Sequence, residues 1–182
     1  MRRELYMLGQ LSDENIEWLF ARGKKKQAPA GTVLIEEGKA SNVVYIVLDG
    51  QLGVFVKSGG RDQQIATRGT GEILGEMSFI DDSPPTATVK TVETSVLFVL
   101  AKSELAHKLE TDRDFAARFY RGIAISLSYR LRESMEQAGS NTRQSTGGEI
   151  DEAEELDSNL LDSVYLAGMR FDRILRRMME TG

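Results

Sequence analysis

The feature that most constrains the fold is a change of hydrophobic period near Leu100. From about residue 29 to residue 100, apolar residues come in short runs separated by glycine-containing turns. After Leu100 they recur with the three- to four-residue spacing of helices. Short strands followed by helices are typical of an α+β protein whose strands form an antiparallel sandwich or barrel.

Turn residues divide the strand region. The run 43–48 is rich in β-branched residues, and Asp49-Gly50 after it predicts a two-residue hairpin leading to the alternating run that starts at Leu52. The glycines in 58–60 predict another turn. Further strands are expected at 32–35, 63–66, 87–92 and 95–100.

Three helices are expected in the first 138 residues. Ser12 or Asp13 can cap one that carries Ile16 and Leu19, and a short one is expected over 102–110. A longer one is predicted from about Arg113 to Gln137, because an apolar stripe recurs every four residues at Phe115, Phe119, Ile123, Leu127, Leu131 and Met135. About 25 residues span roughly 37 Å, so the stripe either packs on the barrel or forms part of a dimer seam.

Composition changes after residue 138. Residues 139–148, GSNTRQSTGG, predict a flexible linker, and 149–182 predict an amphipathic helical tail. The tail contains the whole excess of the net charge of −5. A heptad-like seam is expected at Leu161, Val164, Gly168, Phe171, Leu175 and Met178. Such a tail must pack on the first domain, pair with a second copy, or bind a protein partner.

Composition also excludes several functions. The chain has no cysteine and one histidine, so thiolate zinc sites and cysteine catalysis are excluded, and no metal site or catalytic residue is expected. There is no run of about 18 apolar residues and no signal-peptide core, so we expect a cytoplasmic protein without a membrane span. The acidic tail repels phosphate, and the 44 residues after Ala138 are fewer than the DNA-binding unit of known regulators needs, so no DNA binding is expected.

The most informative stretch covers residues 68–89. It combines a glycine-rich approach, a short apolar piece and a proline-containing turn. Small residues at both ends allow backbone amides to approach an anion. Glu76, set among apolar residues, can accept hydrogen bonds from sugar hydroxyls or can form a salt bridge at the mouth of the barrel.

Together with Gly31, Gly38, Tyr45-Ile46 and Gly50, this stretch resembles the cyclic nucleotide-binding domain of the catabolite activator protein and the protein kinase A regulatory subunit. The resemblance covers about residues 12–138. It implies a jelly-roll-like β-roll flanked by an N-terminal helix and long C-terminal helices. Glu76 would bind the ribose, and amides near Gly75, Met77 and Ala87 would face the cyclic phosphate. The implied ligand-binding residues are Gly75, Glu76, Met77, Ser78, Pro85, Thr86, Ala87, Thr88 and Ser134.

One position departs from the family pattern. Where the family places an arginine that pairs with the cyclic phosphate, this chain has Pro85, which offers neither charge nor donor. Losing one partner of such a pair costs about 2–5 kcal/mol, or roughly 30- to 4000-fold in affinity. Arg61, Arg68 and Lys90 are the nearest basic residues that could substitute. In the family, the stretch that corresponds to residues 75–89 is called the phosphate-binding cassette. This cassette is therefore expected to bind ordinary cyclic AMP weakly or not at all.

These observations predict a noncatalytic regulatory protein that needs no cofactor. It is expected to be a homodimer through the helix around Phe115–Met135, with a protein partner for its tail. One alternative is a sensor of a different ligand, such as a cyclic dinucleotide. Another is a transcription regulator that acts without its own helix-turn-helix.

Overall fold

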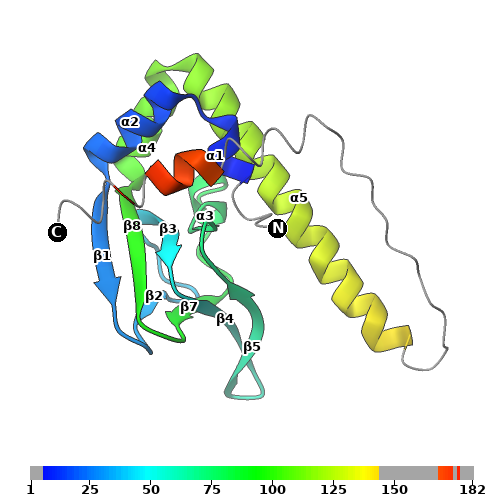
Figure 1. The fold of residues 1–182 in the computed structure, drawn as a ribbon. Coiled ribbons are helices and arrows are strands. Elements are labelled where there is room, and N and C mark those ends of the chain that lie inside the picture. Colours follow the sequence, from blue (N-terminus) through cyan, green and yellow to red (C-terminus); the bar gives the residue numbers. More distant parts are fainter. Residues whose placement is uncertain (1–5, 144–167, 174–175, 177–182) are drawn as a thin grey trace.

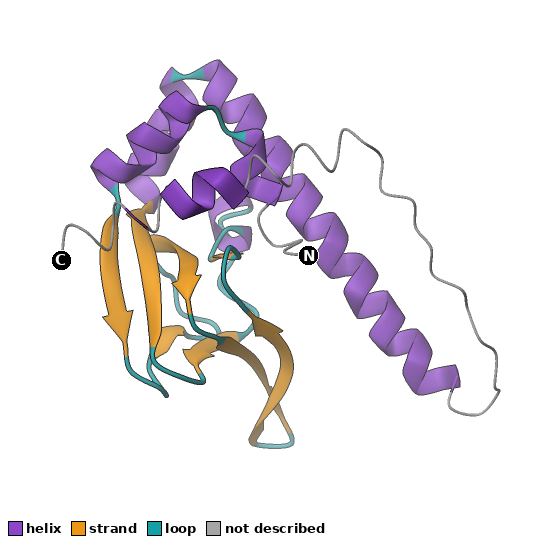
Figure 2. Cartoon of the chain, viewed as in Figure 1, coloured by secondary structure: helices purple, strands orange, loops and turns teal. Residues whose placement is uncertain are grey.

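The computed structural model describes residues 6–143, 168–173 and 176, and it has the expected α+β architecture. Two four-stranded antiparallel sheets face each other, and helices gather at one end of them (Figures 1 and 2). The helices are α1 (Tyr6–Gln10), α2 (Asp13–Arg22), α3 (Met77–Ile80), α4 (Lys102–Thr111) and α5 (Arg113–Arg143). The strands are β1 (Lys24–Ala28), β2 (Val33–Ile35), β3 (Val43–Asp49), β4 (Leu52–Ser58), β5 (Arg61–Arg68), β6 (Ile73–Leu74), β7 (Thr88–Thr91) and β8 (Ser95–Ala101).

The strands pair in the orders β1-β8-β3-β6 and β2-β7-β4-β5. The glycine turn at 58–60 joins the paired strands β4 and β5, as predicted. The hairpin predicted at Asp49-Gly50 is wrong, because β3 and β4 lie in different sheets and Gly50 carries the chain from one to the other. Gly50 has φ +94°, and an added Cβ would lie 2.4 Å from the Ser95 hydroxyl oxygen. A hairpin glycine and a glycine at a tight crossing between layers give the same sequence signal.

Two buried clusters form the core. One lies between the sheets and includes Val47, Leu52 and Leu97. The other joins the first sheet to the helices, and it includes Leu100, Phe115 and residues of α1 and α2. The helices therefore share a core with the sheet, so that movement of a helix changes contacts at the sheet.

The N-terminal region begins as the sequence predicts. The Ser12 hydroxyl accepts a hydrogen bond from the Asn15 amide at 3.2 Å, and the Asn15 side chain accepts one from the Ser12 amide at 3.0 Å. This reciprocal capping box starts α2. After α2, the lysines 24–26 form the edge strand β1, which the sequence analysis did not predict. Charged side chains on an edge strand discourage pairing with another chain.

The long helix ends later than expected. α5 continues to Arg143, through the first five residues of the range 139–148 that was predicted as a linker. Residues 144–148 lie outside the described part of the chain, so the boundary between domain and tail stays a prediction. In the described part, no helix is long and apolar enough to cross a bilayer.

One part of the tail is described. Residues 168–173 are helical and lie beside α1 (Figure 1). Phe171 is completely buried in the cluster that the helices share with the first sheet. Of the three fates expected for the tail, these residues follow the first, packing on the first domain. Of the predicted seam, Gly168 and Phe171 are described, and the other four positions fall outside the described residues.

Candidate functional site

The cassette predicted over residues 75–89 connects β6 to β7 and includes the first two residues of β7. Gly75 follows β6 with φ +83°, a conformation that favours glycine. A Cβ at this position would lie 3.1 Å from the Val43 carbonyl oxygen, so the cassette begins directly against β3. Met77 and Ser78 open α3, where the Met77 side chain is 53% exposed and the Ser78 side chain is half-buried.

Glu76 is the most buried acid of the cassette, with 2% of its surface exposed. Its carboxylate accepts a short hydrogen bond from Nη1 of Arg130 on α5. The second guanidinium nitrogen, Nη2, donates to the carbonyl oxygen of Ile73 at 2.6 Å. Arg130 thus holds both the end of β6 and the start of α3 with one planar group. This geometry matches the salt-bridged alternative for Glu76.

Further charges surround this pair. Oε1 of Glu72 lies 3.5 Å from Nε of Arg68 and 3.8 Å from Nε of Arg130, and Arg68 reaches Glu133 on α5 at 3.3 Å. Nε of Arg130 is buried and has no hydrogen-bond acceptor among the described residues. A buried donor without an acceptor is costly, so this atom would gain from an added oxygen of a ligand or water.

The second half of the cassette rests on the turn after β2. The Pro85 carbonyl oxygen accepts a hydrogen bond from the Gly38 amide at 2.8 Å. The Thr88 hydroxyl accepts one from the Glu37 amide at 3.1 Å. Thr86 is exposed and Ala87 is half-buried. Both residues precede β7, so their amides lie outside the hydrogen-bonded part of that strand. These two hydrogen bonds fix the end of the cassette against the turn after β2, and Pro85 stands at the position of the family arginine.

Two of the three basic residues named as substitutes for that arginine have other partners. Arg68 is ion-paired as described above, and Nζ of Lys90 lies 3.4 Å from Asp62 and 4.0 Å from the centre of the Phe55 ring. Arg61 is exposed at the start of β5.

Sequence reasoning missed two cations of the site. Arg130 was not among the predicted site residues, although its place one turn before Ser134 was a usable signal. Lys102 gave no signal in the sequence, because it begins α4, outside the cassette. Its charge lies near the acids of the cassette only in the folded chain. Burial holds the pKa of Lys102 below its usual value, and the charges of Asp82, Asp81 and Glu76 oppose this shift only in part.

Ser134 is exposed, and its hydroxyl donates to the Arg130 carbonyl oxygen at 2.8 Å. It lies one turn beyond Arg130 on α5, on the helix that reaches the cassette. Its contact with a nucleotide base stays a prediction.

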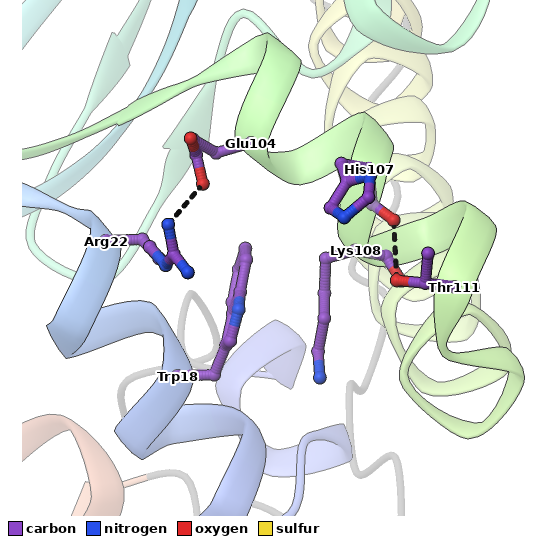
Figure 3. Close-up of a pocket in the computed structure, with 6 residues that line it drawn as sticks. All are labelled: Trp18, Arg22, Glu104, His107, Lys108 and Thr111. Carbon is purple, nitrogen blue, oxygen red and sulfur yellow. Dashed lines mark hydrogen bonds and ion pairs between the residues drawn. The ribbon is translucent and has the colours of Figure 1, made fainter.

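A cavity of about 360 Å³ lies elsewhere, between α2 and α4 (Figure 3). Figure 3 shows the Trp18 ring standing between Arg22 and Lys108. Arg22 pairs with Glu104 at 3.2 Å, and Lys108 pairs with Asp112 at 2.7 Å. Since both cations are already ion-paired, this cavity has weaker anion-binding character than its residue types suggest. The other lining residues are His107 and Thr111.

Comparison with known proteins identifies the family of the domain. Residues 25–112 match the family model of the cyclic nucleotide-binding domain. The chain is 34% identical over 121 residues to the Pycsar effector protein XpPycTIR of Xanthomonas perforans, covering 66% of this chain and 37% of that protein. It is 26% identical over 95 residues to the cyclic AMP receptor protein of Thermus thermophilus, covering 52% and 44%. The chain thus spans less than half of these relatives.

Fold comparison gives the same result. A crystal structure of a cyclic nucleotide-binding domain from Methylobacillus flagellatus KT superimposes with a TM-score of 0.69 at 24% identity, covering 82% of this chain and 86% of that one. At this identity the likeness concerns the fold. The matched family model and the shared fold agree: residues 25–112 form a domain of the cyclic nucleotide-binding family.

Proposed function

We propose that this chain is a noncatalytic regulatory protein of the cytoplasm whose cassette binds ordinary cyclic AMP weakly or not at all. One observation carries the proposal. The cassette glutamate is bound within the protein by Arg130, while Pro85 stands where the family has its phosphate-binding arginine. One polar anchor for a cyclic nucleotide is therefore engaged already, and the other is missing.

The energetic argument has two parts. A nucleotide ribose must either share Glu76 with Arg130 or displace it, and breaking a buried charge pair is costly. At Pro85, the lost arginine–phosphate pair accounts for about 2–5 kcal/mol, or roughly 30- to 4000-fold in affinity. Backbone amides near Thr86 and Ala87 supply the remaining attraction for an anion.

A second candidate function is the sensing of a different ligand. The unsatisfied Nε of Arg130 favours it, because a buried donor without an acceptor among the described residues can bind an added oxygen. Lys102 supplies a further positive charge close to the Asp81-Asp82 turn. Cyclic mononucleotides with other bases and cyclic dinucleotides are the ligand classes to test, by thermal shift with the full chain.

We further propose a homodimer through the second half of α5. Leu131 and Met135 are 62% and 65% exposed there. These two side chains continue the stripe that is buried earlier in the helix, so a second copy of α5 is the matching apolar partner. A signal would then be transmitted by a shift of α5, which requires the ligand to bind its two positions with different affinity.

The test of weak cyclic AMP binding is a gain of function. Pro85→Arg in the full chain should tighten cyclic AMP binding by at least about 30-fold in calorimetry. Pro84→Arg is the matched control, because it adds the same charge to the neighbouring, exposed proline. If Pro85→Arg binds no better than Pro84→Arg, the missing arginine does not limit affinity and the proposal fails.

A further inference from the structure

The described end of the tail makes directed polar contacts with the N-terminal helices. We call residues 168–173 the tail segment. Nη1 of Arg170 donates to the Gly9 carbonyl oxygen at 2.8 Å, near the end of α1. Nε of the same side chain donates to Asp13 at 3.1 Å, at the first residue of α2. Arg170 thus joins the end of one helix to the beginning of the next, and its side chain is only 15% exposed.

The apolar contact of the tail segment is equally specific. Phe171 is completely buried, and it belongs to the same cluster as Met7, Leu8, Phe119 and Ile123. These residues come from α1 and from the first half of α5. A segment that packed loosely on the surface would not bury a whole aromatic ring next to an arginine that is itself mostly buried.

The buried site that Phe171 occupies, which we call its seat, is also connected to the cassette. Phe79 of α3 packs edge to face on Phe119 of α5, with ring centres 6.4 Å apart. A Cβ at Gly122 would lie 3.1 Å from Met7, so α1 and α5 are in close contact. Two turns further on, Arg130 of the same helix holds Glu76. α5 therefore touches the cassette at two points, and its first half belongs to the same buried cluster as Phe171.

We propose that the tail segment is an intramolecular latch whose docking is linked to the cassette through α5. When Arg130 leaves Glu76, α5 shifts against α1, the seat of Phe171 opens and the tail segment is released. Linkage is reciprocal, so loss of the latch changes the stability of the cassette in turn. The release of the latch by a ligand rests on the proposed function, but the linkage itself does not need a ligand.

Amide hydrogen exchange of the full chain tests the linkage without a ligand. Glu76→Gln should accelerate exchange in 168–173 by roughly tenfold, within the usual range of coupling between sites. Asp82→Asn is the matched control, since it makes the same chemical change in the cassette at an exposed residue, and its exchange in 168–173 should match that of the wild type. Unchanged exchange of 168–173 in Glu76→Gln would overturn the proposal, whatever happens to α5.

The reverse experiment guards against a trivial loss of folding. Phe171→Ala should accelerate exchange at 76–80, while Arg176→Ala, at an exposed residue of the same tail, should not. Acceleration confined to the tail in Phe171→Ala would contradict the linkage. Failure of Pro85→Arg to bind cyclic AMP would contradict the proposed function and leave these exchange results unaffected, so the two failures are distinguishable.

Discussion

The two halves of α5 have the same sequence pattern and different surroundings. In the first half, Phe115, Phe119 and Ile123 are buried in the cluster shared with α1, α2 and the first sheet. In the second half, Leu131 and Met135 continue the four-residue period but are mostly exposed, where the helix extends beyond the other helices (Figure 1). An apolar stripe therefore identifies a face of a helix, and the rest of the fold decides what covers it.

Arg130 connects the second half of α5 to the cassette. It is the point at which the exposed half of α5 is tied to the cassette, through Glu76 and the Ile73 carbonyl. The first half is thus held by apolar packing, and the second is held by the pair of Arg130 with Glu76 and the ion pair of Glu133 with Arg68. The predictions below separate these two kinds of attachment.

The largest difference is expected between truncations in the two halves. Phe115→Ala removes a fully buried ring that lies between Trp18 and Phe119, and it should lower the free energy of unfolding by about 3–5 kcal/mol. Leu131→Ala, in the exposed half, should change the free energy of unfolding of the monomeric chain by no more than about 0.5 kcal/mol. Denaturant unfolding at concentrations too low for dimer formation measures both variants, and similar losses would show that Leu131 is covered within the chain itself.

Removal of the charge pair should come next. Arg130→Met keeps much of the side-chain length but leaves Glu76 buried without a partner, so we expect a loss of about 2–3 kcal/mol, less than for a wholly buried pair. Arg132→Met changes an exposed arginine on the same helix and serves as the control. An Arg130→Met variant as stable as Arg132→Met would mean that Arg130 is not an anchor.

The exposed half should govern association. Leu131→Glu places a charge in the proposed dimer seam and should weaken self-association at least tenfold, or about 1.4 kcal/mol. Ser128→Glu adds the same charge at an exposed serine of α5. Light scattering over a range of concentrations distinguishes them. A wild-type chain that stays monomeric, or a Leu131→Glu dimer as tight as the control, would refute the seam.

The smallest effect concerns pH and the tail segment. The hydrogen bond from Arg170 holds the pKa of Asp13 below its usual value of 3.8; burial opposes this effect, and the charges of Arg173 and Arg170 add to it. The stabilising contribution is therefore complete above about pH 4 and is lost as the pH falls through the lowered pKa. Asp13→Asn should make the melting temperature depend less on pH in this window. Asp172→Asn, also at an exposed residue, should leave the slope of melting temperature against pH as in the wild type. Parallel slopes for all three proteins would contradict the contact.

Much of the fold could be predicted from the sequence, because period and turn residues are local signals. The strand-to-helix order, the α2 cap and the stripe of α5 follow from the residues alone. The role of Gly50 could not be predicted, since a glycine at a layer crossing and one in a hairpin share the same backbone requirement. The strand formed by the lysines 24–26 depends on pairing with β8, which has no local signature.

The candidate site was predictable in its backbone and not in its charges. Gly75, Glu76 and the turn to Thr88 form one continuous stretch, so their proximity is a property of the chain. Arg130 and Lys102 come from α5 and α4, and they reach the cassette only because the helices pack on the first sheet. A basic residue near in sequence, such as Lys90, was a poor guide, because it is ion-paired with Asp62 of β5.

The central claim is the proposal that this cassette binds cyclic AMP weakly. Calorimetric titration of cyclic AMP into the wild-type full chain tests it most directly. The account predicts a Kd between roughly tens of micromolar and millimolar, or no measurable heat. A Kd of about 1 μM or tighter would contradict it, because neither the occupied Glu76 nor Pro85 would then limit binding.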